Sequence, residues 1–273
     1  MEDGSWRIVR RARESYRILK NLKRTMAMEK SPSGILGRLT EAHAILVALK
    51  NKKPMEDNSL DIFGRLLEAV PSGKAIVDSA CGHGRYAVMA RDSGRFSRVV
   101  AFDARADRIP FHEPGIEWTI SKIEDWDYSG FDVVVLSGIL YHLDPARQAT
   151  VMRSLSISGA SFLVVNTHHV LSEGETVSRQ PFRNKLDDRI SRLEIDDGLG
   201  GRLAMSGANY LEGGNLRNRP LAAFENTSSF WHTAESLAEM MAHYGFMLKQ
   251  TSEPVVFQDM EYSNRNFFLF ARH

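Results

Sequence analysis

Short, mainly apolar runs alternate with amphipathic stretches between residues 74 and 167 of the chain. Five runs rich in β-branched side chains lie at residues 75–77, 99–102, 118–120, 133–136 and 162–165. Apolar runs without polar alternation suit strands covered on both faces, and strands that alternate with helices form parallel sheets. We therefore predict an α/β domain built on a doubly wound, mostly parallel sheet.

The pattern changes after residue 167. Residues 170–230 are polar and rich in glycine, and a structureless loop of this length is uncommon in a compact domain. We predict an inserted cap there. Residues 234–244 then show helical spacing, with Gly245 as a C-terminal cap. Strand candidates at 247–257 and 266–271 close the chain, which completes a seven-stranded sheet with a final antiparallel hairpin.

Residues 1–70 have helical periodicity. Apolar side chains recur at steps of about three and four residues among basic ones, at Val9, Ala12, Tyr16, Leu19 and Met26. We predict an N-terminal helical extension over 1–70 and a main domain over 71–273, with the cap at about 170–230. The apolar stripe fits packing on that domain. The basic face is either solvated or contacts an anionic membrane surface, a phosphorylated carrier or, less favoured, RNA.

Composition excludes several classes of protein. The chain has 273 residues, 43% of them hydrophobic, and a net charge of +1, so global charge selects no partner. Its only cysteine is Cys81, which rules out an intramolecular disulfide and fits a reducing compartment. No secretory-type apolar run is visible, and no stretch approaches the roughly 18 apolar residues of a membrane span. We expect a cytoplasmic protein.

The segment 76–87 carries the strongest chemical signal. A predicted strand runs into a turn with Gly82 and Gly84, and the turn leads into a helix. Glycine permits close backbone approach, so a ligand can lie against the loop and the helix N-terminus. Asp103 ends the next predicted strand, where a carboxylate can accept hydrogen bonds from both ribose hydroxyls. The pattern indicates a nucleotide-type site.

Four segments in order resemble the class I S-adenosylmethionine-dependent methyltransferases. Val-Asp-Ser-Ala-Cys-Gly-His-Gly at 77–84 resembles their first motif, and Val-Ala-Phe-Asp at 100–103 resembles their second. Residues 131–143, which end in Leu-Tyr-His-Leu, resemble the fourth-strand motif, and residues 228–246 resemble the C-terminal part of many members. The resemblance covers roughly 74–273. It implies a Rossmann-like methyltransferase fold and S-adenosyl-L-methionine as the cofactor.

The resemblance also implies a set of cofactor-binding positions. Asp78 would lie near the methionine amino group, Asp103 would bind the ribose, and Ser137 and Ile139 would line the methionine side. The remaining positions are the loop residues Ala80, Cys81, Gly82 and Gly84 beneath the cofactor, and Ala104, Ile123 and Glu124 around the adenine. Two departures stand out: Ala80 replaces a common glycine, and Lys122 stands where an acid often contacts the adenine amine.

Three histidines are candidates for a general base. His142 follows the fourth predicted strand, and His168 and His169 follow the fifth, at the sheet edge where ligands bind in open α/β sheets. The alternative is packing beneath the cofactor for His142 and a solvated loop for the pair. Their spacing predicts no metal site. We expect methyl transfer to an oxygen of a small molecule or a glycan, while nitrogen or carbon acceptors stay open.

Three other functions are compatible with parts of the pattern. Gly82, Gly84 and Ala87 also satisfy the fingerprint of NAD(P)-binding oxidoreductases. That fingerprint usually follows its strand almost directly, whereas Asp78 to Cys81 intervene here, and an acid at Asp78 would repel a pyrophosphate. An RNA-modifying methyltransferase would use the basic N-terminal helix, but no RNA-binding module is recognisable. A non-catalytic binding subunit on the same fold is the third.

Overall fold

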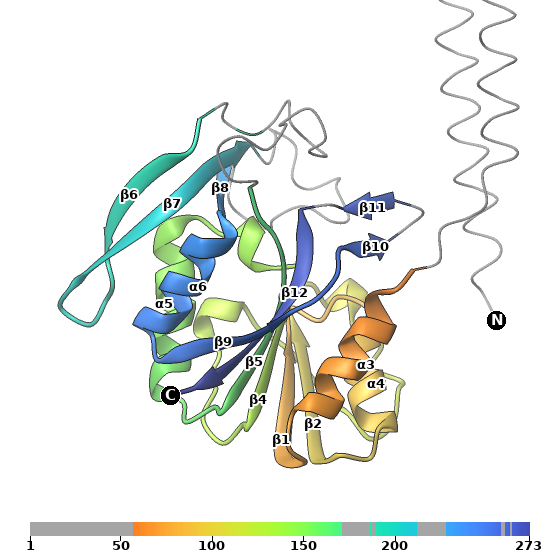
Figure 1. Cartoon of the computed structure of the whole chain (residues 1–273). Coiled ribbons are helices and arrows are strands. Elements are labelled where there is room, and N and C mark those ends of the chain that lie inside the picture. Colours follow the sequence, from red (N-terminus) through yellow and green to blue (C-terminus); the bar gives the residue numbers. More distant parts are fainter. Residues whose placement is uncertain (1–56, 171–185, 187–188, 212–227, 258–259, 263) are drawn as a thin grey trace, which may run out of the picture. The chain divides into compact units, whose positions relative to one another are not determined.

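The computed structural model describes residues 57–170, 186, 189–211, 228–257, 260–262 and 264–273. Within this part of the chain the main sheet has seven strands (Figure 1). The strand order is β3-β2-β1-β4-β5-β12-β9. Its strands are β1 (Gly73–Ser79), β2 (Phe96–Asp103), β3 (Glu117–Ile120), β4 (Val133–Ser137), β5 (Phe162–His168), β9 (Phe246–Thr251) and β12 (Arg265–Arg272). All neighbours are parallel except β12, which runs antiparallel to both β5 and β9. The predicted mostly parallel, seven-stranded sheet is confirmed.

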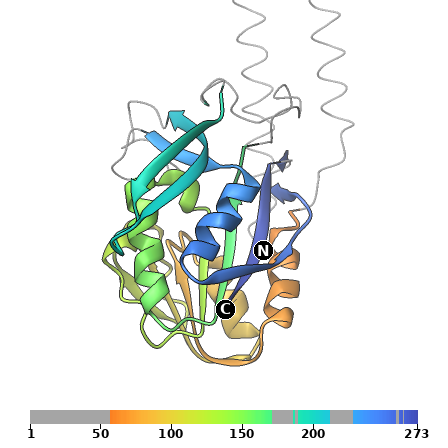
Figure 2. The ribbon, with the colours of Figure 1, turned by 60° about the vertical axis from the view of Figure 1, so that its left-hand side comes forward.

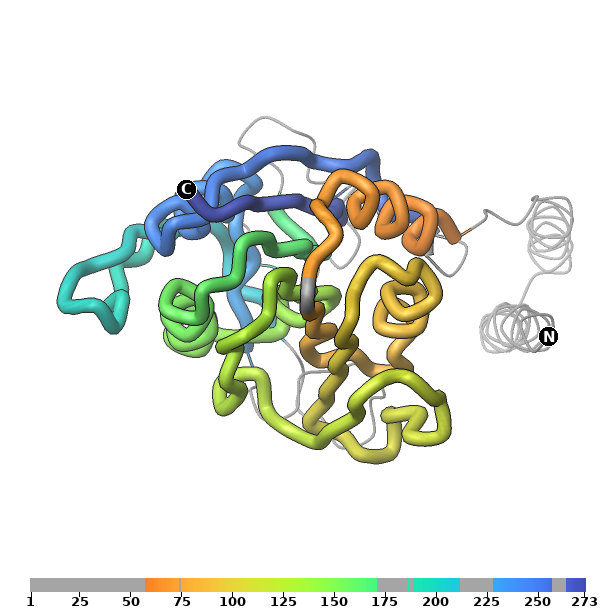
Figure 3. Tube along the Cα trace, turned by 90° about the horizontal axis from the view of Figure 1, so that it is seen from below, coloured from red at the N-terminus to blue at the C-terminus, as the bar shows by residue number. Residues whose placement is uncertain are grey.

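Helices cover both faces of this sheet. On one face, α3 (Ser59–Ala69) and α4 (Arg85–Asp92) pack their apolar sides in a core that includes Phe63, Tyr86 and Val135. On the other face, α5 (Pro145–Ile157) and α6 (Ala234–His243) pack in a core that includes Met152, Met240 and Leu136. Figure 3 views the molecule from below and shows the two helix layers. Consecutive residues of β4 point into the two opposite cores. Both faces of the strand are therefore buried, which explains why its sequence is a continuous apolar run.

Three one-turn 3₁₀ helices follow β2, β3 and β4. They are η1 (Ala106–Arg108), η2 (Ile123–Asp125) and η3 (Leu140–His142). Because β1 to β4 are parallel, these turns and the glycine loop after β1 all lie at the carboxyl edge of the sheet. In a doubly wound sheet this edge, where the strand order reverses between β1 and β4, is where ligands bind.

A second, antiparallel sheet lies beside α5 and α6 (Figure 2). It consists of β6 (Ser191–Asp196), β7 (Arg202–Leu211) and β8 (Ser228–His232), in that order. Phe230 and Met205 of this sheet join the core of the α5–α6 face. We call these three strands the cap sheet. They fall within or just beyond the predicted insertion at 170–230, whose residues 171–185, 187–188 and 212–227 lie outside the described residues.

Helix starts follow local sequence signals. Asp144 accepts a hydrogen bond from the Arg147 backbone N–H at 2.9 Å, and Pro145 occupies the first turn of α5. Thr233 caps α6 by accepting from the Ser236 N–H at 3.1 Å. Gly245 follows α6 with φ of 87°, as a C-terminal cap requires.

One strand prediction was wrong and one region is untested. The single strand predicted at 247–257 is divided into β9 and β10 (Val255–Phe257), and β10 pairs with β11 (Met260–Tyr262) instead of the main sheet. Pro254 stands between them and has no N–H to continue a ladder. The helices predicted before residue 57 lie outside the described residues, so the boundary at residue 70 stays a prediction, although α3 packs on the sheet. Within the described part, no helix is long and apolar enough to cross a membrane.

Candidate functional site

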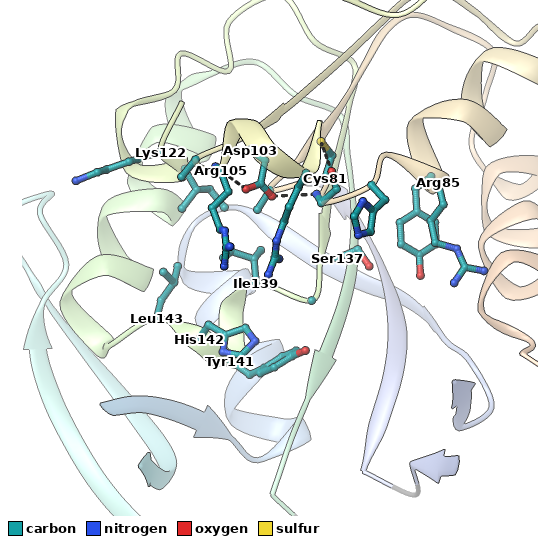
Figure 4. A pocket seen from close by; sticks show the side chains of 18 of the residues that line it. Cys81, Arg85, Asp103, Arg105, Lys122, Ser137, Ile139, Tyr141, His142 and Leu143 are labelled. Carbon is teal, nitrogen blue, oxygen red and sulfur yellow. Dashed lines mark hydrogen bonds between the residues drawn. The ribbon is translucent and has the colours of Figure 1, made fainter. Parts of the chain in front are cut away.

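A cavity of about 300 Å³ opens at the carboxyl edge of the sheet. Figure 4 shows Asp103, Arg105 and Cys81 along one side of it, and Tyr141 and His142 on the opposite side. Cys81 lies in the loop after β1, Asp103 is the last residue of β2, and Arg105 follows it. Tyr141 and His142 belong to η3 after β4. The cavity therefore lies across the point where the strand order of the sheet reverses.

The loop after β1 is held in an unusual backbone conformation. Ala80, Gly82 and Gly84 have φ of 54°, 55° and 68°. Asp103 fixes the loop, because its Oδ2 accepts from the Gly82 N–H at 2.9 Å while its Oδ1 accepts from the Arg105 N–H at 2.9 Å. A carboxylate oxygen has a second lone pair, so Asp103 retains acceptor capacity toward the cavity that it lines.

The two glycines of the loop serve different purposes. A Cβ at Gly84 would overlap the Trp118 ring, so glycine there is required by packing against β3. A Cβ at Gly82 would meet nothing within 4 Å, although Gly82 lines the cavity. Its missing side chain leaves open space that a ligand can fill.

Asp78 lies beneath this loop and not on the cavity surface. Its Oδ2 accepts from the Ala87 N–H of α4 at 3.1 Å, and its Oδ1 is buried without a hydrogen-bond partner among the described residues. Burial raises the pKa of the Asp78 carboxyl to about 7, the bond from Ala87 opposes this, and the charge of Asp103 adds to it. A buried acid with an unused oxygen lies close behind the loop.

The opposite wall is anchored to the cap sheet. The Trp231 Nε1–H donates to the Tyr141 carbonyl at 3.0 Å, and the Phe230 N–H donates to the Leu143 carbonyl at 3.1 Å. Both donors belong to β8, and both acceptors lie in or directly after η3. The cap sheet thus fixes the backbone that carries Tyr141 and His142.

A buried glutamine completes this anchor. The Gln148 Nε2 amide donates to the carbonyls of Leu140, Leu143 and Phe230 at 3.1, 3.1 and 2.9 Å. Carbonyls only accept, so the amide oxygen must face His232, whose Nε2 lies 2.6 Å away and therefore carries the proton. Burial lowers the pKa of His232 to about 3, which keeps the ring neutral and the network in one arrangement.

Most of the sequence-predicted positions meet in the cavity. Its lining includes Ala80, Cys81, Gly82, Asp103, Ala104, Ile123, Glu124, Ser137, Ile139 and His142. Asp78 and Gly84 support the loop from behind. Lys122, the noted departure, also lines the cavity.

His168 and His169 are not brought to the cavity. His168 is buried at the end of β5, stacked on Trp231 at 4.8 Å and edge-on to Tyr141 at 4.6 Å. Burial lowers the pKa of His168 well below its ordinary value. His169 lies 2.9 Å from Asn266 Oδ1 through its Nε2. His168 is thus buried in ring contacts at the end of β5, and His169, half-buried directly after β5, is bonded to β12.

Several lining residues were missed by the sequence analysis. The cationic ones are Arg85, Arg105, Arg108, Arg147 and Arg265. Arg85 and Arg105 directly follow motif residues in the sequence, so their positions next to the motifs could have suggested them. Arg265 lies on the antiparallel strand β12, and only the sheet topology brings it to the cavity.

The structure resembles solved proteins in fold, although no family model and no curated protein matches the chain by sequence. The N-terminal domain of EvdMO1, solved with S-adenosylhomocysteine bound, superposes with a TM-score of 0.53 at 14% identity, covering 78% of this chain and 79% of that one. An S-adenosylmethionine-dependent methyltransferase from Methanosarcina mazei gives 0.52 at 12% identity, covering 76% and 96%. A putative methyltransferase from Listeria monocytogenes gives 0.50 at 13% identity, covering 79% and 99%.

The sheet topology agrees with these likenesses. A doubly wound dinucleotide-binding sheet has the order 3-2-1-4-5-6 and parallel strands, whereas here the antiparallel β12 separates β5 from β9. The chain has the class I methyltransferase fold. In this methyltransferase fold, β1, β2 and β4 carry three of the four segments that resemble family motifs, and the cap sheet is an addition between β5 and α6.

Proposed function

We propose that the protein binds S-adenosyl-L-methionine and transfers its methyl group to an oxygen of a small molecule or a glycan. The observation that carries the proposal is the loop of residues 80–84, clamped by Asp103 and open to the cavity at Gly82. The methyltransferase fold raises the expectation, but fold alone does not fix an activity.

The residues present fit this cofactor. Open space at Gly82 admits a ligand against the backbone, and Asp103 can accept hydrogen bonds from ribose hydroxyls. Asp78 places a titratable carboxyl behind the loop, which suits the amino group and the sulfonium of the cofactor. At the loop of residues 80–84 itself, these two acids disfavour the pyrophosphate of NAD(P). An RNA acceptor and a purely binding role stay as outcomes of the tests below.

His142 is the candidate general base. It lines the cavity opposite Asp103, and its ring lies 4.3 Å from that of Tyr141 between centroids. Bound S-adenosylmethionine supplies a methyl carbon that its sulfonium already activates. A ring nitrogen of His142 would accept the proton of an acceptor hydroxyl as the oxygen bonds to that carbon and the carbon–sulfur bond breaks, with S-adenosylhomocysteine as the leaving group. The fixed η3 backbone would hold His142 in position for this step.

Cofactor binding is tested at Gly82. Gly82→Ala is expected to weaken S-adenosylmethionine and S-adenosylhomocysteine binding by more than tenfold, because the new methyl group occupies the open space. Gly94→Ala is the matched control: Gly94 has φ of 64° and equally open surroundings, but it does not line the cavity. Both variants should lose about 1–2 kcal/mol of stability from the left-handed backbone. Isothermal titration measures the cofactor affinity of both variants. Equal cofactor affinity in the two variants, or binding of NAD(P) alone by the wild type, contradicts the proposal.

Turnover is tested at His142. His142→Gln is expected to lower methyl transfer by about 100-fold or more, the range of general-base contributions, with cofactor affinity within about twofold. Formation of S-adenosylhomocysteine with a panel of hydroxyl-bearing acceptors measures the rate. Undiminished turnover in the variant removes His142 from the mechanism, and absence of turnover with every acceptor favours a binding role.

A further inference from the structure

Cations outnumber acids in the cavity. Its lining includes six cationic side chains, Arg85, Arg105, Arg108, Lys122, Arg147 and Arg265, and only two carboxylates, Asp103 and Glu124. Three of these cations have acid partners: Arg85 pairs with Asp57 at 2.9 Å, Arg105 with Asp107 at 3.2 Å, and Arg147 lies 3.4 Å from Asp144 and 3.6 Å from Glu124. With the three partner acids outside the lining counted as well, six cations face five carboxylates, so cations remain in excess. The proposed methyl donor adds one net positive charge, because its sulfonium and ammonium groups together outweigh its carboxylate. Since a second cation would raise the repulsion, the charge balance of the cavity favours an anion as the other ligand.

Arg108 shows this imbalance at the level of one side chain. Its Nη2 is buried and has no hydrogen-bond partner in the described part of the chain. Burial lowers the pKa of the Arg108 guanidinium and the neighbouring charge of Arg105 lowers it further, while the charges of Asp103 and Asp107 oppose this without cancelling it. A guanidinium donor left without an acceptor is costly, so an acceptor group from a ligand would relieve it.

Arg265 marks where the anion would bind. Its Nε–H donates to Asn166 Oδ1 at 2.7 Å, and Asn166 is fully buried on β5. Its guanidinium lies 5.7 Å from the centre of the Tyr141 ring. A Cβ built on Gly138 would lie 3.4 Å from an Arg265 terminal nitrogen and 3.7 Å from the Tyr141 hydroxyl. The two polar groups therefore converge directly beyond the end of β4, next to His142.

We propose that the methyl acceptor is itself an anion, whose carboxylate or phosphate group is bound by Arg265 and Tyr141 at the end of β4. The planar fork of an arginine matches two oxygens of either group, and such charge-assisted pairs are among the strongest hydrogen bonds in proteins. Anchoring the anion there brings the rest of the acceptor to His142. This inference rests on the proposed function and narrows its substrate class.

Matched pairs of small probes test the inference in the wild-type protein saturated with S-adenosylhomocysteine. The carboxylate arm compares 4-hydroxybenzoate with 4-hydroxybenzamide, and the phosphate arm compares phenyl phosphate with phenol. We expect at least one anion to bind tenfold or more tightly than its neutral counterpart in calorimetric titrations, and the arm in which this happens identifies the group. If neither anion binds more tightly than its counterpart, the inference is overturned.

Substitution at Arg265 locates the effect. Arg265→Gln is expected to reduce the anion preference at least fivefold with unchanged S-adenosylhomocysteine affinity, while Lys249→Gln, which removes one charge from the exposed surface of β9, leaves the preference intact. A preference that survives Arg265→Gln overturns the assignment to Arg265. The probe comparison needs no variant, so it decides even if Arg265→Gln fails to fold. If the wild type does not bind S-adenosylhomocysteine, the proposed function is refuted. If it binds the cofactor but shows no preference for an anion, only this inference is refuted.

Discussion

Asp78→Asn is expected to stabilise the free protein at pH 8, to leave its stability almost unchanged near pH 4, and to weaken S-adenosylmethionine binding. The Asp78 carboxyl has a pKa of about 7 in the folded protein, against 3.8 without the protein environment, chiefly because it is buried. A raised folded pKa means that the stability contribution is complete below pH 3.8 and is lost as the pH rises through 7. The ionised carboxylate therefore costs up to about 4 kcal/mol at pH 8.

The asparagine avoids this cost and keeps the main contact, since its amide oxygen can accept from the Ala87 N–H. The measurement is the melting-temperature difference between variant and wild type at pH 4, 6 and 8. A stability gain of 1 kcal/mol corresponds to roughly 2–4 °C in a domain of this size. Asp92→Asn, at an exposed acid on α4, the helix that carries Ala87, is the control. A difference that does not change with pH would contradict the assignment of the shifted pKa to Asp78.

The melting temperature is compared between variant and wild type at each pH because the effect of His232 on the pH dependence of stability opposes that of Asp78. Burial lowers the pKa of His232 to about 3 from 6.5, so its contribution to stability is lost as the pH falls below 6.5. The two effects run in opposite directions between pH 4 and 7, and the wild-type curve alone would hide both. Subtracting the wild type isolates Asp78.

Cofactor binding gives the second half of the same prediction. A cationic ligand favours the ionised carboxylate, so wild-type affinity for S-adenosylmethionine is expected to rise as the pH passes 7. In Asp78→Asn this rise should disappear, with affinity at pH 8 at least tenfold weaker. An equally pH-dependent affinity in the variant would show that the carboxyl does not act on the ligand.

The central strands were predictable because each is a short run whose residues face two apolar layers. Residues 133–136 in β4 are all apolar and buried, so neither their hydrophobic pattern nor their burial is that of an amphipathic helix. The glycine loop was predictable for a related reason: Gly82 and Gly84 follow a strand and precede a helix, and such turns need φ > 0. In both places the local sequence and the tertiary structure favour the same conformation.

Residues at the cavity were missed where their position depends on topology. Arg265 reaches the site because β12 inserts antiparallel beside β5, which pairs Arg265 with His168. Nothing in the local sequence distinguishes it from other arginines. The same pairing explains His168: a residue expected in a loop is the last residue of a buried strand, covered by Trp231 from a sheet that local patterns did not resolve.

The cap sheet was predictable only as an insertion. Strand β6 alternates between exposed and half-buried residues, because only one of its faces packs on the domain. The glycines of the predicted insertion include Gly207, where the reason for glycine is close contact between strands. A Cβ there would overlap the Trp231 carbonyl oxygen and lie 2.9 Å from the Phe230 ring.

Gly207→Ala is therefore expected to disrupt the pairing of β7 with β8 and to destabilise the protein by about 3 kcal/mol or more, since the overlapped atom belongs to the backbone and cannot rotate away. Trp231 and Phe230 hold the carbonyls of Tyr141 and Leu143, so the displacement should reach the η3 wall of the cavity. Amide hydrogen exchange at residues 140–143 is expected to accelerate along with the drop in melting temperature. Gly200→Ala, in the turn that joins β6 to β7, is the control. Its φ is 91° and its surroundings are open, so the substitution should cost only about 1–2 kcal/mol and leave exchange at η3 unchanged. Equal effects of the two substitutions would mean that the cap sheet does not support the wall that carries His142. S-adenosylhomocysteine affinity should change little in either variant, because Cys81 and Asp103 lie on the opposite side of the cavity from Tyr141 and His142 of η3 (Figure 4).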